Sequence, residues 1–321
     1  MADAYPVLIV TYARPEGLRK ILEISSSAGA RDIYVAIDGP KDELTASKQF
    51  AILNEIRDFE VKNAIKIKVW QRDRNLGAAV SVVTAIDWFF TNESAGLIFE
   101  DDLIPSIEFF SFAKLGLENY EHNKEIWMIS GSRMNRVIQN KNTNDWSLYP
   151  MIWGWATWRS RWSMMKLAFT SDEKEATSFF SARANFWKVG AFRAKIGMVD
   201  AWDMPLAYFQ WSNSKFSVIP PVNLVTNVGF DSAATHTSGE HYPLSHPIME
   251  LPQSFQFEKV PDISSAHEYD RDLERELFGI KWHHSFLTMY RSLIDKVRNQ
   301  NMRLGSLEER LNKVVIPQKE L

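Results

Sequence analysis

The sequence predicts an α/β protein built on a mostly parallel β-sheet with helices on both faces. Short apolar runs alternate with helical segments through the first 130 residues. In addition, the apolar run 97–99 ends in three consecutive acids, Glu100, Asp101 and Asp102. Repeated strand–helix units form parallel sheets with right-handed crossovers. Ligands of such sheets bind beyond the carboxyl ends of the strands, which is where these acids are expected.

The individual elements follow in chain order. Runs rich in Val, Ile and aromatic residues predict strands at 7–12, 32–38, 65–70, 97–100 and 126–130. Apolar residues at helical spacing predict a first helix with Leu18, Ile21 and Leu22 on one face, and further helices at 44–59, 78–90 and 109–120. Another strand or extended edge is expected at 220–225. The ends of the first four strands should therefore lie along one edge of the sheet.

Composition narrows the possible functions. The 321 residues are 45% apolar, so the chain can bury a large core. A formal net charge of -3 gives no general reason to expect a nucleic-acid partner. The absence of cysteine excludes disulfides, zinc–thiolate sites and thiol nucleophiles. There is no signal-peptide pattern and no apolar run of about 18 residues, which predicts a cytoplasmic protein.

The acids at 100–102 are the strongest functional signal. Adjacent carboxylates repel one another unless a cation or hydrogen-bond donors engage them. Oxygen ligands of this kind suit Mg²⁺ or Mn²⁺, which combine one or two carboxylates with phosphate oxygens. The alternative is a solvated acidic turn before a helix that starts near Pro105 and Ser106. Because the acids end a buried strand, we favour a metal and nucleotide site.

Other residues at strand ends fit a nucleotide site. Arg14 and Arg74 offer planar donors for a phosphate or a base. Asp38 can accept hydrogen bonds from a base or a ribose, and Gly77 permits a close backbone approach. Taken singly, Arg14 before Pro15 is an ordinary helix start, and Asp38 belongs to an ordinary turn. The chain lacks the Gly-x-Gly-x-x-Gly fingerprint and the P-loop, which argues against a dehydrogenase or an ATPase.

Several further motifs occur in a fixed order. They are Thr11-Tyr12-Ala13-Arg14, Ile37-Asp38-Gly39, Glu100 to Pro105 with Phe109-Phe110, Gly154-Trp155 with Trp158 and Trp162, Trp202-Asp203, and Asn227 to Phe230 with His236. This ordered set resembles the GT-A nucleotide-sugar glycosyltransferases, in particular the N-acetylglucosaminyltransferase I type and bacterial enzymes of the same layout. The resemblance covers roughly residues 5–245. It implies a GT-A, Rossmann-like fold for this stretch and leaves the C-terminal stretch unmatched, where the apolar spacing predicts a helical tail.

The resemblance also implies roles on the donor side. Asp102 would coordinate a divalent metal, Mn²⁺ or Mg²⁺, that bridges the diphosphate of the sugar nucleotide. Glu100 and Asp101 would contact ribose or sugar hydroxyls. The remaining expected donor contacts are Thr11, Arg14, Asp38, Arg74, Gly77 and Trp155.

An inverting enzyme needs a carboxylate base that takes the proton of the acceptor hydroxyl. Asp203 resembles that base, and Asp200 is the second choice. Asp203 also fits a helix N-cap, because Pro205 follows at an early helical position. His236 lies in a loop of small residues, 231–241, that suits a lid over the donor, and it would add a metal or phosphate contact. A surface histidine without function is the alternative.

The densest aromatic cluster lies at 153–162. Trp155, Trp158 and Trp162 have the i, i+3, i+7 spacing of a helix, which predicts a stripe facing the core. Flat aromatic faces also suit sugar rings. Trp155, next to Gly154, is the one tryptophan expected to contact the donor or the acceptor.

The C-terminal stretch has a different character. Apolar residues from Phe286 to Val297, continued by Leu304, Leu307 and Leu311, predict an amphipathic helix. Between residues 281 and 313 there are seven Lys or Arg against three Asp or Glu. Such a helix suits the inner face of the cell membrane, where lipid-linked acceptors lie. Packing on the catalytic domain or on another subunit is the alternative that we favour.

Together these observations predict a nucleotide-sugar-binding half at 1–130, an acceptor-binding half of the same domain at 131–250, and a helical extension at 251–321. The expected function is metal-dependent, inverting transfer from a nucleotide-diphosphate sugar to a glycan or lipid-linked hydroxyl, in bacterial surface polysaccharide synthesis. A UDP-sugar is the first donor to test. One alternative is a sugar-nucleotide-forming nucleotidylyltransferase, but residues 11–17 lack its Gly-rich, basic loop. A catalytically inactive sugar-binding module is the other alternative.

Overall fold

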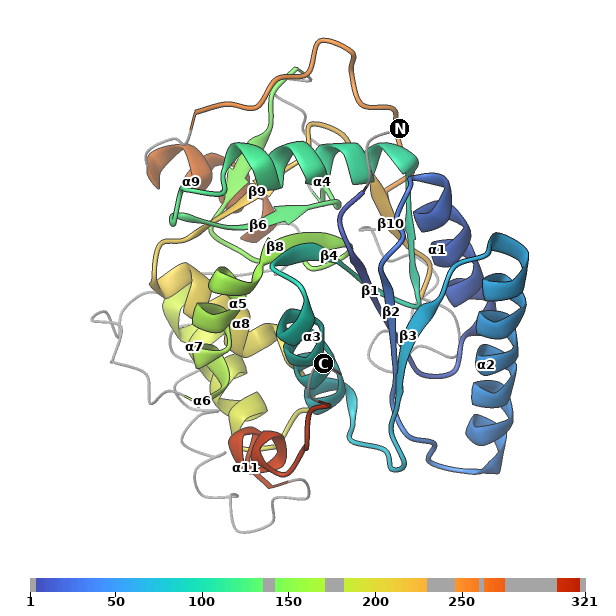
Figure 1. Ribbon diagram of the computed structural model, residues 1–321. Coiled ribbons are helices and arrows are strands. Elements are labelled where there is room, and N and C mark those ends of the chain that lie inside the picture. Colours follow the sequence, from blue (N-terminus) through green and yellow to red (C-terminus); the bar gives the residue numbers. More distant parts are fainter. Residues whose placement is uncertain are drawn as a thin grey trace.

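An eight-stranded sheet runs through the centre of the molecule (Figure 1). The computed structural model describes residues 4–134, 142–170, 182–229, 246–259, 263–274 and 305–317. The strands of this sheet are β1 (Val7–Thr11), β2 (Ile33–Ile37), β3 (Ile67–Gln71), β4 (Ala95–Glu100), β6 (Ile126–Ser130), β7 (Asp145–Ser147), β8 (Trp155–Trp158) and β9 (Phe216–Ile219). A separate two-stranded sheet pairs β5 (Leu103–Pro105) with β10 (Val225–Asn227).

The strand order in the large sheet is β3-β2-β1-β4-β8-β6-β9-β7. The strands β3, β2, β1 and β4 are parallel neighbours, and β6 is parallel to β9. β8 is antiparallel to both β4 and β6, and β7 is antiparallel to β9. Thus β8 and β7 run against the other strands of the sheet, and the predicted α/β fold with a mostly parallel sheet is confirmed.

In the second half of the chain, two elements differ from those predicted. The spacing of the tryptophans predicts a helix through Trp155 and Trp158, but these residues form β8, and the helix α5 begins only at Arg159. The prediction that the tryptophans are buried is correct, since Trp155 is 1% exposed. A strand buried on both faces is apolar at successive positions, so a short run with tryptophans at three-residue spacing fits either element. Of the strand or extended edge expected at 220–225, only Val225 belongs to a strand, because β9 ends at Ile219 and β10 begins at Val225.

The helices of the first half agree with the predictions to within a few residues. The structure contains α1 (Pro15–Ser27), α2 (Glu43–Asn63), α3 (Ala78–Asn92), α4 (Ile107–Asn119), α5 (Arg159–Met165), α6 (Leu167–Thr170), α7 (Ala182–Lys195), α8 (Asp203–Ser212), α9 (Ile263–Asp272) and α11 (Leu307–Asn312). Pro15 starts α1 at a position where its missing N–H costs no hydrogen bond. The side chains of Asp42 and Ser106 cap α2 and α4.

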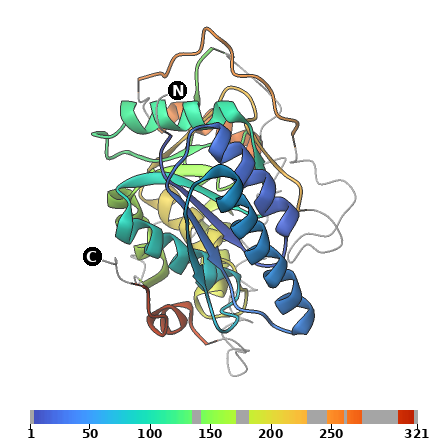
Figure 2. The same cartoon turned by 45° about the vertical axis from the view of Figure 1, so that its right-hand side comes forward.

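Alternate residues of the central strands build two hydrophobic clusters, one on each face of the sheet. Val7 and Ile9 of β1 belong to the cluster formed with α1, α2 and α4. Leu8 and Val10 belong to the cluster formed with α3, α8 and α11. Figure 1 shows these two groups of helices on opposite sides of the central strands, and Figure 2 shows α1 and α2 side by side on one of them. Because both faces are covered, every residue of β1 is buried, which explains the uninterrupted apolar run.

The C-terminal stretch packs on the rest of the molecule wherever the structure describes it. Residues 246–259 contain no helix, and Phe255 and Phe257 contact Phe112 of α4. The short helix α11 buries Leu307 in the cluster that it shares with α3. The predicted helix at 286–297, Leu304 and the predicted loop at 231–241 lie outside the described residues. Among the helices described, none has the length and apolar character needed to cross a membrane.

Candidate active site

Glu100 ends β4, and Asp101 and Asp102 follow it at the carboxyl edge of the sheet, next to the end of β1. The hydroxyl of Thr11 donates to Oδ2 of Asp101 over 2.8 Å, and the backbone N–H of Tyr12 donates to the same oxygen over 2.9 Å. Asp101 therefore holds the start of the loop between β1 and α1. Both Thr11 and Asp101 have partners within the protein, so their predicted contacts with the donor stay predictions.

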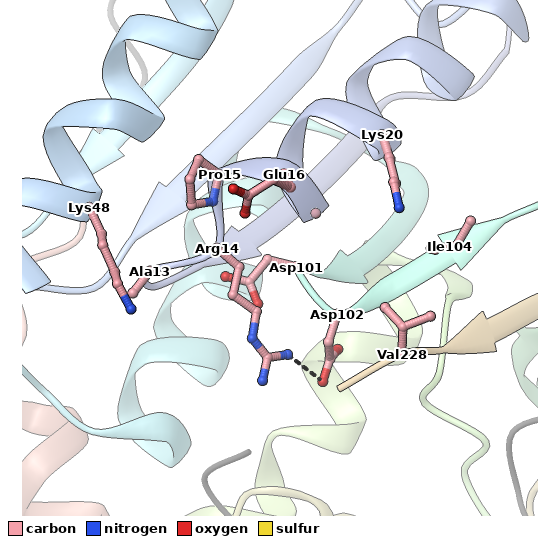
Figure 3. Close-up of a pocket in the computed structure, with 11 residues that line it drawn as sticks. Ala13, Arg14, Pro15, Glu16, Lys20, Lys48, Asp101, Asp102, Ile104 and Val228 are labelled. Carbon is pink, nitrogen blue, oxygen red and sulfur yellow. Dashed lines mark ion pairs between the residues drawn. The ribbon is translucent and has the colours of Figure 1, made fainter. Parts of the chain in front are cut away.

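Asp102 lies beside the guanidinium of Arg14. Oδ2 of Asp102 and NH1 of Arg14 are 3.5 Å apart, and each side chain is 27% exposed. Figure 3 shows Arg14 reaching from the loop after β1 toward Asp102, with Asp101 close by. The predicted donor contact and the predicted metal ligand are thus neighbours. Both retain access to solvent, which a binding residue requires.

The small sheet brings a distant segment to Asp102. Asn227 of β10 lies opposite Leu103 of β5, and the N–H of Val228 donates to the carbonyl of Asp102 over 2.9 Å. The side chain of Asn227 also hydrogen-bonds to the Asp102 carboxylate. A Cβ on Gly229 would lie 2.3 Å from Oδ2 of Asp102, so only glycine fits there without moving the carboxylate. The motif at 227–229 therefore shapes one side of the acidic site.

Removal from water and mutual repulsion alter the pKa values of the acids. Burial, followed by the charges of Asp102 and Asp101 and that of Asp203, raises the pKa of Glu100 to about 8. Burial and the charge of Asp101 raise the pKa of Asp102 to about 6, although Arg14 acts in the opposite direction. Burial also raises the pKa of Asp101. The acids repel one another in the absence of a ligand, and a cation would relieve that repulsion.

The structure separates the two candidate bases. Asp203 is the first residue of α8, whose N-cap is Trp202, and its charge acts on Glu100. Asp203 is thus close enough to Glu100 for its charge to raise the pKa of that acid. It is a first-turn residue of α8 rather than the expected N-cap. Asp200, by contrast, accepts hydrogen bonds from the N–H groups of Ala78 (2.7 Å) and Ala79 (3.4 Å) at the start of α3.

Asp38 fixes the loop between β3 and α3. Its carboxylate accepts hydrogen bonds from the N–H of Leu76 (3.0 Å), the N–H of Gly77 (3.2 Å) and the side-chain amide of Asn75 (3.0 Å). Asp38 is 5% exposed, and burial raises its pKa against the effect of these donors. Its carboxylate is engaged by the protein, so the predicted contact with a base or a ribose stays a prediction.

Three further predicted residues differ in accessibility. Gly77 has a φ of +83°, and a Cβ on it would lie 2.3 Å from Oδ2 of Asp200, so the position requires glycine. Arg74 is exposed in the same loop. Trp155 is buried and stacks on Trp202 with a ring-centroid distance of 6.2 Å. The predicted contact of Trp155 with a ligand stays a prediction.

His236, the second predicted metal ligand, lies outside the described residues.

A cavity of about 420 Å³ adjoins the acids and Arg14. Lys20 of α1 and Lys48 of α2 line it together with Asp101 and Asp102 (Figure 3). Neither lysine was predicted from the sequence as a site residue. Both lie on the exposed sides of helices, where a lysine is the ordinary residue, so nothing in the sequence distinguishes them. The cavity combines cations with carboxylates, which suits an anionic ligand that carries a metal ion.

A metal ion would depend on few protein ligands here. Among the described residues, no three His, Asp or Glu side chains converge as a metal cluster. Mg²⁺ nevertheless commonly binds through one or two carboxylates and completes its shell with phosphate oxygens and water. Asp102, which is partly exposed and whose pKa is raised to about 6, fits the role of such a single carboxylate ligand.

Comparisons with known proteins give a partial likeness in fold. No family model and no curated protein matches the sequence. One similar structure is the 4-diphosphocytidyl-2C-methyl-D-erythritol synthase of Anaerococcus prevotii, with a TM-score of 0.35, 12% identity, and coverage of 55% of this chain and 79% of that chain. Another is a UDP-glucose pyrophosphorylase complexed with UDP-glucose, with a TM-score of 0.36, 8% identity, and coverage of 67% and 90%.

A third similar structure is the glucosyl-3-phosphoglycerate synthase of Mycobacterium tuberculosis. Its TM-score is 0.29 and its identity 11%, with coverage of 49% of this chain and 57% of that chain. At these scores the likeness assigns no activity to this chain.

Proposed function

We propose that this protein is a metal-dependent, inverting glycosyltransferase that uses a nucleotide-diphosphate sugar, with a UDP-sugar as the first donor to test. The observation that carries the proposal is the grouping of charges at the carboxyl edge of the sheet. Asp102 lies beside Arg14. The charge of Asp203, which belongs to a helix far away in the sequence, raises the pKa of Glu100. This grouping agrees with the ordered motifs that resemble GT-A glycosyltransferases.

The donor diphosphate would lie in the cavity between Arg14, Lys20 and Lys48. Cations around a partly enclosed cavity attract a diphosphate, and the planar guanidinium of Arg14 can bind two of its oxygens. Asp102 would hold Mn²⁺ or Mg²⁺ together with the phosphate oxygens. The metal ion would supply Lewis-acid stabilisation of the charge on the leaving diphosphate.

Asp203 would accept the proton of the acceptor hydroxyl. A general base has to reach the attacking group, and Asp203 comes from the part of the fold that follows the donor-binding strands. Its placement at the start of α8 gives its backbone a fixed direction. Glu100, with a pKa raised to about 8, keeps its proton at neutral pH in the ligand-free protein and can donate a hydrogen bond to a sugar hydroxyl.

The acceptor would be a glycan or a lipid-linked saccharide, as in bacterial surface polysaccharide synthesis. A cytoplasmic enzyme that meets its lipid-linked acceptor at the membrane surface would suit this role. The acceptor and the location belong to the proposal, and they rest on the motif resemblance and on the basic composition of residues 281–313.

The test compares Asp203→Asn with Asp200→Asn and Asp102→Asn in a transfer assay over a panel of nucleotide sugars with Mn²⁺. Asp203→Asn should lower turnover about a hundredfold or more, the scale of losing a positioned general base. Its affinity for UDP with Mn²⁺ should hardly change, because the carboxylate acts on the acceptor. Asp102→Asn should lose the Mn²⁺-dependent part of UDP binding. The exposed variant Asp58→Asn serves as the control.

NMR of the anomeric proton of the product completes the test. The proposal expects the anomeric configuration to be inverted relative to the donor. A retained configuration would contradict the mechanism, and full activity of Asp203→Asn would contradict the choice of base. Formation of a nucleotide sugar from a sugar 1-phosphate and UTP would instead identify a nucleotidylyltransferase.

A further inference from the structure

The described C-terminal segment reaches the edge of the candidate active site. α11 begins with a capping box formed by Ser306 and Glu309, and it buries Leu307 against the cluster that contains α3. This places Arg310 at the loop between β3 and α3. NH2 of Arg310 donates to the carbonyl of Leu76 over 2.8 Å and to Oδ1 of Asp200 over 2.9 Å. One nitrogen thus connects two segments that are far apart in the sequence.

Asp200 is held from two directions. Its Oδ2 accepts the N–H of Ala78, and its Oδ1 lies 2.9 Å from NH2 of Arg310. The side chains of Arg310 and Asp200 are 13% and 24% exposed, so water screens this ion pair only in part. Asp200 precedes Asp203 by three residues, with Trp202 buried between them. A displacement of Asp200 would therefore shift the start of α8.

The loop between β3 and α3, which Arg310 contacts at Leu76, is also held by Asp38. Asp38 accepts the N–H groups of Leu76 and Gly77, and those hydrogen bonds do not involve Arg310. Loss of Arg310 would leave the loop tied to the end of β2, but it would remove one of the two supports of Asp200 and leave only the N–H groups of Ala78 and Ala79. The effect should therefore fall on the segment that carries Asp203 and spare the donor-binding loop.

We propose that Arg310 is a positioning residue that fixes the start of α8, and with it Asp203, through Asp200. Asp200 then serves as the anchor of the base and is not the base itself. This inference rests on the proposed function for its effect on catalysis. The hydrogen-bonded arrangement of Arg310, Asp200 and Ala78 makes a prediction that is independent of any activity.

The first measurement is hydrogen exchange in the full chain. Arg310→Met removes both hydrogen bonds and keeps a long apolar side chain. Lys313→Met makes a similar change at an exposed position of the same segment. Arg310→Met should accelerate exchange of the Ala78 and Ala79 amides and of residues 198–203, and Lys313→Met should leave these rates unchanged. Arg310→Lys should restore most of the protection, because one ammonium group can supply both contacts. Unchanged exchange in Arg310→Met would overturn the inference.

The second measurement separates turnover from donor binding. Misplacing a catalytic group by about 1 Å costs about a hundredfold in rate. Arg310→Met should lower kcat about tenfold or more, with little change in the KM of the donor and with an unchanged pH profile, and Arg310→Lys should recover activity. A raised KM at unchanged kcat, or a faster enzyme, would overturn the positioning role. If the wild-type protein transfers no sugar from any donor, the proposed function fails, and the exchange experiment still decides whether Arg310 anchors Asp200.

Discussion

At the scale of single residues, the candidate site brings several carboxylates close together, and the positive charges of the protein balance their negative charge only in part. Arg14 is close to Asp102, while Glu100 experiences the charges of Asp102, Asp101 and Asp203. The free-energy cost of this arrangement to the folded state depends on pH, because a protonated carboxyl group carries no charge. It is therefore not repelled by the neighbouring carboxylates, and its burial costs less. The folded protein without ligands should therefore hold its proton at Glu100 more tightly than the unfolded chain does.

The variant Glu100→Gln tests this cost. Folding raises the pKa of Glu100 from 4.5 to about 8, so the folded state binds more protons than the unfolded state between these values. The free energy of unfolding of the wild type should fall as the pH rises from about 4.5 to about 8. A glutamine resembles the protonated acid and does not titrate. The Tm of Glu100→Gln should therefore match that of the wild type at pH 4.5 and exceed it at pH 8.

The control for this experiment is Glu23→Gln on the exposed side of α1, whose Tm should follow that of the wild type at both values. A metal-free wild type that is as stable as Glu100→Gln at pH 8 would contradict the prediction. The Tm values of the three proteins are measured by thermal denaturation in the presence of EDTA.

At the scale of elements, helix termini and strand ends place the side chains of the candidate site. β4 presents the acids, the loop after β1 presents Arg14, and α8 presents Asp203 at its start. The short helix α11 has six residues and depends on tertiary contacts for its stability, since isolated helices of this length do not persist. Its buried Leu307 supplies such a contact.

Leu307→Ala tests whether α11 is part of the folded domain. Leu307 is 0% exposed, and truncation of a buried leucine to alanine costs about 2–5 kcal/mol because it removes apolar contacts and leaves a cavity. The matched control is Val315→Ala, since Val315 is 87% exposed and should contribute little. Urea denaturation of both variants gives the free energies of unfolding. Equal stability of Leu307→Ala and wild type would mean that this segment does not dock in solution.

At the scale of the whole molecule, ligand binding should be coupled to stability. A ligand that binds only the folded state raises the Tm. Metal binding through carboxylates requires deprotonated oxygens, and the pKa of Asp102 is raised to about 6. Binding of a metal-bound diphosphate should therefore strengthen as the pH rises through this value.

UDP with Mn²⁺ should raise the Tm of the wild type more at pH 8 than at pH 5.5. EDTA should abolish most of the increase, because the metal ion links the diphosphate to Asp102. Asp102→Asn should show a small increase at both pH values, which separates the titration of this residue from the titration of UDP itself. An increase of equal size in EDTA would exclude a metal-dependent site for this nucleotide.

Local sequence patterns were enough to predict the strand–helix units of the first half, from β1 to α4, and the acids at the end of β4. These features depend on the local sequence. Hydrophobic periodicity distinguishes a helix from a strand, and the acids at the end of a predicted strand indicate where a ligand could bind. The burial of Trp155 could also be predicted. Its element could not, because a short apolar run fits either a strand or a helix.

The choice of neighbouring strands and of side-chain contacts depends on tertiary packing and could not be predicted from local patterns. β8 inserts between β4 and β6, although the chain reaches β6 first. The carboxylate of Asp38 holds the loop at 75–77, a contact that the sequence did not predict. Asp200 and Arg310, 110 residues apart in the sequence, form an ion pair. The physical reason is that strand pairing and ion pairs depend on how buried surfaces pack together, and local periodicity carries no information about contacts at such separations.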